Sequence, residues 1–331
     1  MPNIRIQVLA FAILLITSLT FGAHAQQIIS IDAGPRGTYA TAVNPAGVIV
    51  GWVWDDRTWG YPFLRKLDGS IALLNVGPNG GRAYGINPAG QITGFYFDAN
   101  RRAHGFLRNR DGSVTRFDAG PNETYPLGIN PAGQVVGEYS EEIGWKTHAF
   151  LRQTDGTIIS LDPPGTVYSS ARAINPAGEI AGFYVDTTSV AHGFLRKPDG
   201  KIVSFDAVPG SRGTIPWAIN PAGQIAGFYV DFNGGTRGFL READGRITPF
   251  AGTAGALDTF PRAISPKGEI VGEHIDRTGT HGFVREPSGY ISSFNAADSR
   301  WMYPFAITPS GKIVGWYYDT NSVAHGFLLK K

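Results

Sequence analysis

The chain has 331 residues, 29 basic and 27 acidic side chains, a formal net charge of +2 and no cysteine. The near-neutral charge and the lack of a basic run exclude the broad positive field that nucleic acid or an anionic membrane surface would need. With 44 Gly, 22 Pro and only two Met among many aromatic residues, the composition favours short strands and tight turns over long helices.

Residues 1–25 predict a cleaved secretory signal peptide. Arg5 is their only charged residue, residues 6–22 are almost entirely apolar, and Ala23-His24-Ala25 matches an A-x-A cleavage site. The alternative is a membrane anchor, but the apolar run is short for a span and is interrupted by polar side chains. We therefore expect a mature chain from about Gln26 that is periplasmic or extracellular and has no membrane span after cleavage.

From residue 44 onward, a turn of the form Asn-Pro-Ala-Gly or a degenerate copy of it occurs seven times. The copies begin at Asn44, Asn87, Asn130, Asn175, Asn220, Ser265 and Thr308. The intervals of 43, 43, 45, 45, 45 and 43 residues are typical of a repeat fold. The first residue can bond forward to the backbone, Pro fixes φ, and Gly accepts the left-handed conformation, so each copy predicts a hairpin.

Each repeat predicts four short antiparallel strands. In the fourth copy a small residue and an aliphatic residue, Ala173-Ile174, end the first strand. An apolar run after the turn, such as residues 224–230 in the fifth copy, forms the second. The third strand contains Phe-Leu-Arg at 194–196. Asp199-Gly200, a strong hairpin signal, joins it to a fourth strand at 202–206.

Units of this size match the blades of a β-propeller. The last repeat stops after its third strand, and the missing fourth strand appears at residues 28–35, which resemble residues 114–121. We therefore predict an all-β fold: a seven-bladed β-propeller of four-stranded antiparallel blades, with residues 26–331 as one domain. The N-terminal strand would complete the last blade and close the ring, which removes an open edge.

The repeat motif resembles that of the bacterial extracellular HAF repeat family. The resemblance rests on Ile-Asn-Pro-Ala-Gly-Gln-Ile-x-Gly-Phe-Tyr, then His-Gly-Phe-Leu-Arg or His-Ala-Phe-Leu-Arg, then Asp-Gly, and His148-Ala149-Phe150 is the literal form. It covers essentially the whole mature chain. It implies an exported repeat protein without an assigned activity, so there are no catalytic residues to transfer. The first and fifth repeats depart from it, with Tyr61 and Arg237 near the histidine position.

Five histidines occupy one position of the third strand: His104, His148, His192, His281 and His325. We interpret them as hydrogen-bonding residues that tie strand and loop together. The alternative is a ring of metal ligands, but equivalent positions lie a full blade apart, too far to share a zinc ion at ~2 Å bond lengths. Aspartates such as Asp98 and Asp231 open the loops after the second strands and favour turns over calcium loops. We expect no metal and no cofactor.

The repeats differ most in the loops between second and third strands and in the connections between blades. Aromatic and arginine side chains there are typical of a sugar or peptide site, although such aromatic rings also fill gaps between blades. The candidate ligand-binding residues are Trp59, Arg57, Arg102, Trp145, Trp217 and Trp301. We therefore expect a monomeric, non-catalytic binding or scaffold propeller with a glycan or a protein segment on its variable-loop face.

Two alternatives stay open, a purely structural envelope component and a propeller enzyme. The enzyme would be a lyase or glycosidase with its site in the central cavity. No catalytic motif such as Gly-x-Ser-x-Gly occurs in the chain. Carboxylates converging on the cavity would favour an enzyme, whereas an axis lined only by Ala, Gly and Ile would count against one. The acidic and histidine candidates for that cavity are Asp55, Asp56, Glu141, Glu142, Asp258 and His274.

Overall fold

The computed structural model describes residues 27–55, 59–142 and 146–330, and these form strands and turns without a helix. The prediction of an all-β fold is confirmed. Within the same residues there is no helix long and apolar enough to cross a membrane. The predicted signal peptide lies outside the described residues.

The strands follow the sequence repeats. The first strands are β2 (Thr38–Val43), β6 (Gly81–Ile86), β10 (Thr124–Ile129), β14 (Tyr168–Ile174), β18 (Gly213–Ile219), β22 (Asp258–Ile264) and β26 (Trp301–Ile307). The second strands are β3 (Ile49–Val53), β7 (Ile92–Phe97), β11 (Val135–Glu142), β15 (Ile180–Val185), β19 (Ile225–Val230), β23 (Ile270–Asp276) and β27 (Ile313–Tyr318).

The outer half of each repeat is built in the same way. The third strands are β4 (Tyr61–Arg65), β8 (Ala103–Arg108), β12 (Lys146–Arg152), β16 (Ala191–Arg196), β20 (Thr236–Arg241), β24 (Gly279–Arg285) and β28 (Ala324–Lys330). The fourth strands are β5 (Ile71–Leu73), β9 (Val114–Phe117), β13 (Ile158–Ser160), β17 (Ile202–Phe205), β21 (Ile247–Phe250) and β25 (Ile291–Phe294), and the N-terminal strand is β1 (Gln27–Ile31).

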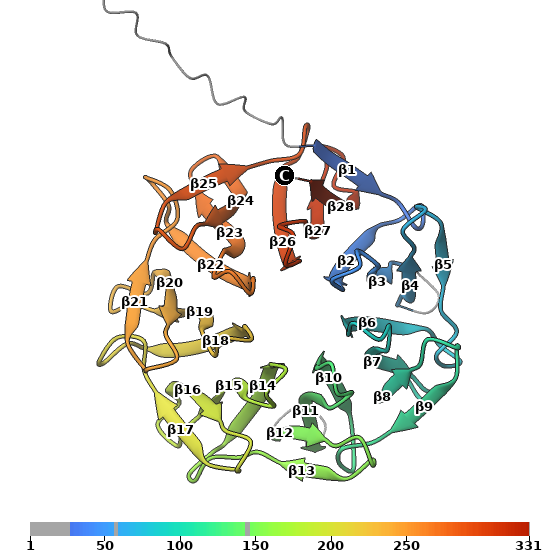
Figure 1. Ribbon diagram of the computed structural model, residues 1–331, viewed down its shortest axis with the longest axis horizontal. Helices are drawn as coiled ribbons and strands as arrows, with labels where there is room; N and C mark the ends of the chain where they lie inside the picture. The colour runs from blue at the N-terminus through green and yellow to red at the C-terminus, as the bar shows by residue number, and fades with distance from the viewer. Residues whose placement is uncertain (1–26, 56–58, 143–145, 331) are drawn as a thin grey trace, which may run out of the picture.

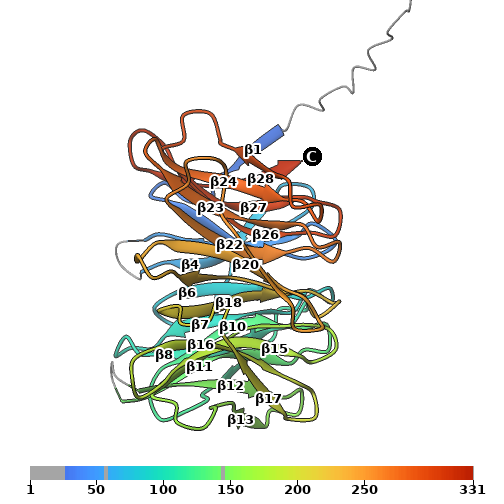
Figure 2. The same ribbon diagram turned by 90° about the vertical axis from the view of Figure 1, so that its left-hand side faces the viewer.

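Strands that are consecutive within a repeat pair antiparallel, as in the sheet β6-β7-β8-β9. Figure 1 shows these sheets placed radially around a central axis, with the first strands nearest the axis and the fourth strands outermost. This is the arrangement of a β-propeller. Strand β1 pairs antiparallel with β28, from Gln27↔Lys330 to Ile31↔Gly326, so the two ends of the described chain lie side by side (Figures 1 and 2).

The Asn-Pro-Ala-Gly turns form the expected hairpins. In the fourth repeat the Gly178 N–H donates to the Asn175 carbonyl at 3.0 Å, and Gly178 has a φ of 82°, which favours glycine. The Asn175 side chain has two roles, because its Oδ1 accepts from the Glu179 N–H at 2.9 Å and its Nδ2 donates to the Asn220 carbonyl of the next repeat at 3.2 Å. The turn residue therefore also joins neighbouring repeats.

Phenylalanine side chains form the core between sheets. The third-strand phenylalanines are fully buried: Phe63, Phe106, Phe150, Phe194, Phe239, Phe283 and Phe327. Each pairs across the sheet with a glycine of the second strand, as Phe194 does with Gly182. A Cβ atom at Gly182 would lie 2.2 Å from the Ser170 carbonyl oxygen and 2.5 Å from the Phe194 ring, so only glycine fits. Phe205 then packs edge-on against Phe239 of the following repeat at 6.1 Å.

Candidate functional site

Each first strand carries a β-bulge at the same point of the repeat. The pairing register shifts between Ala171 and Ala173 in β14, for example, and leaves Arg172 as the extra residue. A bulge redirects a side chain from the regular alternation of the strand and is common beside functional sites. The bulged residues are Thr41, Tyr84, Leu127, Arg172, Trp217, Arg262 and Phe305.

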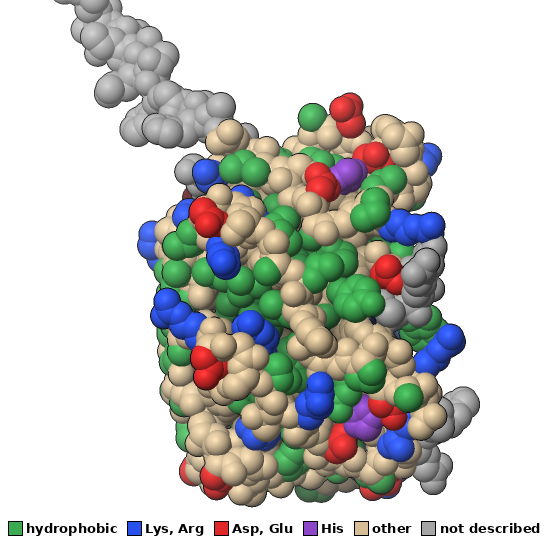
Figure 3. All heavy atoms as spheres, turned by 90° about the vertical axis from the view of Figure 1, so that its right-hand side faces the viewer, with side chains coloured by type: hydrophobic (Ala, Val, Ile, Leu, Met, Phe, Trp, Pro, Cys, Tyr) green, Lys and Arg blue, Asp and Glu red, His purple; other side chains and the backbone are tan. Residues whose placement is uncertain are grey.

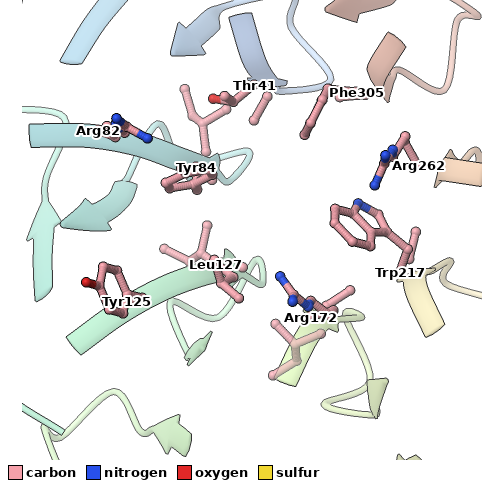
Figure 4. A pocket seen from close by; sticks show the side chains of 18 of the residues that line it. Thr41, Arg82, Tyr84, Tyr125, Leu127, Arg172, Trp217, Arg262 and Phe305 are labelled. Carbon is pink, nitrogen blue, oxygen red and sulfur yellow. The ribbon is translucent and has the colours of Figure 1, made fainter. Parts of the chain in front are cut away.

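All of these bulged residues line one cavity on the axis, with a volume of about 610 Å³. Figure 4 shows them reaching into it from different first strands. The residues that follow them, such as Ala173 and Ala218, also line the wall. Because the bulged position carries a different kind of side chain in almost every repeat, the cavity is chemically asymmetric although the backbone around it is regular.

One side of the cavity carries two arginines that flank a tryptophan. The guanidinium carbons of Arg172 and Arg262 lie 4.9 and 4.4 Å from the centre of the Trp217 ring, within cation–π range (Figure 4). Arg262 is also paired with Glu273 of β23, whose oxygens accept from the Arg262 Nε at 2.9 and 3.1 Å. Arg172 forms no ion pair within the described residues, and its Nε is buried without a hydrogen-bond partner among them.

Aromatic rings also stack on one another in the first and last repeats. Tyr39 stacks on Trp52 at a centroid distance of 4.0 Å, and Tyr303 stacks on Trp316 at 4.1 Å. Tyr39 and Trp316 then meet edge to face at 5.2 Å. Arg82, another residue of the cavity wall, lies 4.0 Å above the Trp52 ring. The cavity wall itself combines apolar ring surface, as from Tyr84 and Trp217, with the positive charge of arginines such as Arg82.

Glu138 of β11 is the carboxylate of the cavity wall. Its position in the second strand is aromatic in most repeats, with Trp52, Phe95, Phe183, Phe228 and Trp316 as counterparts and Glu273 as the second acidic one. Tyr168 of β14 donates its hydroxyl hydrogen to Oε2 of Glu138 at 3.1 Å. Burial, followed by the charge of Glu138, raises the pKa of Tyr168, so this phenol stays protonated and donates to the carboxylate at neutral pH.

The five repeated histidines lie away from the axis, and their interpretation as hydrogen-bonding residues is confirmed. His192 places Nδ1 2.8 Å from an oxygen of Asp206 and Nε2 3.4 Å from Asp186, so it bridges the fourth strand and the loop after the second. His325 does the same between Asp32 and Asp319. We call these arrangements histidine clamps. Figure 3 shows histidines at the surface beside acidic side chains.

The aspartates of the variable loops form turns, as expected. Asp98 Oδ1 accepts backbone hydrogens from Asn100 and Arg102, both at 2.8 Å. Asp186 does the same for Thr188 and Val190, and the Val190 hydrogen bond is the largest cause that lowers the pKa of Asp186 to about 2. These carboxylates are occupied by their own loops.

Three of the sequence-predicted site residues lie on separate loops and strand ends. Trp59 is 45% exposed and packs edge-on against Phe97, with Arg101 5.4 Å from its ring. Arg102 instead donates from Nη2 to the Pro121 carbonyl at 2.6 Å. Trp301 opens β26 and packs edge-on against Tyr318 at 5.7 Å.

Trp217 differs from the other sequence-predicted residues because it lies in the middle of β18 and lines the axial cavity. The sequence placed it in a loop or a connection between blades. Tyr84 and Tyr125, which also line the cavity, likewise lie within first strands. The first strands extend further toward the N-terminus than the short Ala-Ile pairs indicated. Arg57 and Trp145 lie outside the described residues.

None of the described acidic and histidine candidates for the central cavity lines its wall. Glu141 pairs with Lys146 at 2.8 Å and lies 3.3 Å from the clamp residue His148. Asp258 accepts from the Thr236 N–H, and His274 is buried with Nε2 3.0 Å from the Thr253 hydroxyl. Asp55 is also absent from the wall of the cavity described above. Asp56 and the side chain of Glu142 lie outside the described residues.

Comparison with known proteins gives a fold but no family. No family model matches the chain, and no curated protein matches it. Among solved structures, a catalytically inactive variant of virginiamycin B lyase from Staphylococcus aureus with quinupristin is similar, with a TM-score of 0.61 and 14% identity over 92% of this chain and 100% of that one. The selenomethionine form of the same lyase gives a TM-score of 0.58 and 15% identity over 92% and 99%.

Puromycin hydrolase is also similar, with a TM-score of 0.59 and 12% identity over 90% of this chain and 52% of that one. Identities this low establish the propeller fold alone. They also show that solved propellers of this kind include enzymes.

The prediction of a non-catalytic binding protein with its ligand on the variable-loop face is therefore wrong. The described loop aspartates and Arg102 are engaged by their own or neighbouring loops, whereas variable side chains from every repeat converge on the axis. An axis lined only by Ala, Gly and Ile would have supported the earlier interpretation, but this axis carries Arg, Trp, Tyr and Glu.

Proposed function

We propose that the protein is an enzyme whose active site is the axial cavity. One observation carries the proposal: the β-bulges of the first strands direct a varied set of side chains, including Arg172, Trp217 and Tyr84, into a single cavity. A cavity with mainly apolar walls and a few convergent polar groups is the usual form of a small-molecule site. Glu138 is the group on its wall suited to take a proton.

Of the two enzyme classes considered, a lyase fits the cavity better than a glycosidase. Glycoside hydrolysis uses two carboxyl groups on either side of the scissile bond. Glu138 is available for such a role, but Glu273 is 2% exposed and held by Arg262, so it is not free to act on a substrate. Elimination needs one base and a positive group that stabilises the charge developing on the substrate, which Glu138 and Arg172 supply.

The proposed reaction is an elimination across a carbon–oxygen bond. Glu138 removes a proton from a carbon made acidic by a neighbouring carboxyl or carbonyl group. The electron pair of that C–H bond becomes the carbon–carbon double bond as the bond to the leaving oxygen breaks. The leaving oxygen then receives the proton that Glu138 has taken, so no water is consumed. Tyr168 holds the carboxylate in place through its hydroxyl.

Mass spectrometry of reaction products tests this proposal. The mature protein is incubated with a panel of bacterial and plant glycans and acylated peptides. In an elimination the two product masses add up to that of the substrate, whereas in a hydrolysis they exceed it by one water molecule. We expect elimination products, and a Glu138→Gln variant that loses at least ~100-fold in rate while keeping its fold.

A Glu242→Gln variant serves as the matched control, because Glu242 lies at the turn after β20 and its carboxylate bonds only Gln224 among the described side chains. Hydrolytic products would show that the enzyme is a glycosidase and not a lyase. Glu138→Gln activity equal to that of the unaltered protein would overturn the assignment of the base.

We also propose that the propeller has seven blades and that β1 closes the ring. The antiparallel pairing of β1 with β28 and the contact of Asp32 with His325 at 2.7 Å support this closure. Deletion of residues 27–31 would then open the ring and lower the melting temperature. We further propose that the protein is exported and belongs to the HAF-type repeat family. N-terminal sequencing of the secreted chain tests the export, because cleavage at the predicted site gives a chain that starts at Gln26.

A further inference from the structure

The arginine–tryptophan stack in the axial cavity has an unbalanced charge. Arg172 and Arg262 are both within 5 Å of the centre of the Trp217 ring, at 4.9 and 4.4 Å. Two like charges held this close to one indole repel each other in a partly buried site. Glu273 neutralises Arg262 through two hydrogen bonds to its Nε. No carboxylate among the described residues pairs with Arg172.

Arg172 is nevertheless fixed in position. It comes from the bulge of β14, and its guanidinium carbon also lies 5.3 Å from the centre of the Phe183 ring. Contacts to two aromatic rings hold the guanidinium group without using its hydrogen-bond donors. The buried Nε has no acceptor among the described residues, and a buried donor of this kind is costly until it is paired.

The wall also presents ring surface and apolar side chains. Tyr84, Leu127 and Phe305 reach the cavity from other first strands (Figure 4). Flat apolar surface of this type packs against the C–H face of a sugar ring, while the planar fork of an arginine matches a carboxylate. The two features lie in one cavity of about 610 Å³, a size that accommodates a short oligosaccharide.

We infer that the substrate is a carboxylate-bearing saccharide, of the hexuronate type, and that Arg172 binds its carboxylate. The inference rests on the proposed lyase function and names its substrate class. A carboxylate next to the acidic C–H would place the negative charge that develops during proton removal against the guanidinium group. Arg172 is then one of the cavity arginines that have no carboxylate partner among the described residues.

Binding measurements on the Glu138→Gln protein test the inference separately from turnover. Three probes are titrated by calorimetry: a hexuronate trimer, its methyl ester, and the hexose trimer of the same linkage. We expect the hexuronate trimer to bind at least ~10-fold more tightly than either neutral probe, with an affinity that falls as salt is added.

An Arg172→Met substitution in the same background is expected to remove this preference, so that charged and neutral trimers bind alike. Met keeps the length and the apolar contact with Trp217 but lacks the charge. Arg110→Met is the matched control, because Arg110 is exposed on the turn after β8. It should leave binding unchanged, and circular dichroism verifies that both variants are folded.

The outcomes separate the two proposals. Equal affinity for the three trimers, or an unchanged preference in the Arg172→Met protein, would overturn the anionic substrate class. The lyase proposal would survive that result if elimination products still form from another substrate. Tight, Arg172-dependent binding of the hexuronate trimer without any elimination by the unaltered protein would instead reject the lyase and retain the binding site.

Discussion

The histidine clamps and the axial side chains belong to the same repeats but are built in different ways. At the periphery, His104, His148, His192 and His325 each place Nδ1 2.6–2.8 Å from an aspartate oxygen, in one geometry that recurs around the molecule. On the axis, the bulged position changes from Thr41 to Arg172 to Trp217 while the backbone bulge stays the same.

This difference separates structural from functional positions. A residue that repeats with one set of partners satisfies a need that every repeat shares, such as tying a loop to a strand. A residue that changes at a fixed backbone position meets no common structural need. Substitutions in the first group should therefore lower stability, and substitutions in the second should impair the proposed chemistry with little loss of stability.

The largest effect is expected in the shared core. Phe194→Ala removes a fully buried ring and should lower the free energy of unfolding by ~3–5 kcal/mol, because burial is lost and a cavity remains. Urea denaturation measures this change. Phe232→Ala, at a loop phenylalanine that is 61% exposed, is the control and should change stability by less than ~0.5 kcal/mol. Similar losses for both would contradict the role assigned to the core ring.

The next effect tests the axis. Trp217→Leu removes the ring that lies against Arg172 and Arg262, so we expect the elimination rate to fall ~100-fold, equivalent to ~2.7 kcal/mol of transition-state stabilisation. Stability should change by less than ~1 kcal/mol, because Trp217 is only partly buried at the cavity wall. The ratio of rate loss to stability loss is the quantity to measure. A Trp217→Leu protein that unfolds readily yet keeps its elimination rate would show that Trp217 is a structural rather than a functional residue.

A smaller effect is expected at the turns that join neighbouring repeats. Asn175→Ala removes the acceptor for the Glu179 N–H and the donor to the Asn220 carbonyl, and should cost ~1–3 kcal/mol of stability. Asn175→Ser keeps a short acceptor, as Ser265 does for the Glu269 N–H at 3.1 Å, but not the amide donor. It should fall between the unaltered and Ala proteins in thermal denaturation. Equal losses for Ser and Ala would assign the whole effect to the hydrogen bond between repeats.

The smallest effect is a pH dependence at the clamps. Burial lowers the pKa of His192, but the hydrogen bonds and charges of Asp206 and Asp186 outweigh burial and raise the pKa above its usual 6.5. A raised histidine pKa means that the folded state binds the proton more tightly than the unfolded state. The stabilisation is therefore fully present below pH 6.5 and is lost as pH rises through the raised pKa.

Comparison of the unaltered protein with His192→Gln at about pH 5.5 and about pH 8.5 measures this contribution, which we expect to be ~0.5 kcal/mol larger at the lower pH. His281→Gln is the matched control, because His281 keeps a loop aspartate, Asp276 at 3.2 Å, but has the neutral Asn295 as its fourth-strand partner. It should show a smaller pH dependence. A His192 contribution that grows with rising pH would contradict the ion-pair interpretation.

Much of the fold follows from local sequence. The Asn-Pro-Ala-Gly turns, the Asp-Gly turns and the Phe-Leu-Arg strands each specify short-range geometry, so the four-strand unit and its order could be predicted residue by residue. The role of His192 could be predicted as well, because a histidine that recurs with an aspartate fourteen residues later has a local partner. Local partners leave a periodic signal in the sequence.

The contacts of the proposed active site leave no periodic signal in the sequence. Glu138 and Tyr168 are thirty residues apart, and they meet only because the second strand β11 packs against β14, the first strand of the next repeat. Arg172 occurs in a motif that otherwise looks structural, and its redirection requires a bulge that the sequence does not mark. One clue was present: the residue before Ala-Ile or Gly-Ile differs from copy to copy within an otherwise uniform motif.

The sequence by itself therefore determined the repeating unit, its turns and its all-β class, because those depend on residues a few positions apart and on backbone preferences of Gly, Pro and Asn. Only the tertiary structure decided which variable residues act together. Radial packing brings one bulged residue from each repeat to a common axis. It leaves the loop residue Trp59 and the strand-end residue Trp301 apart, where they contact different neighbours.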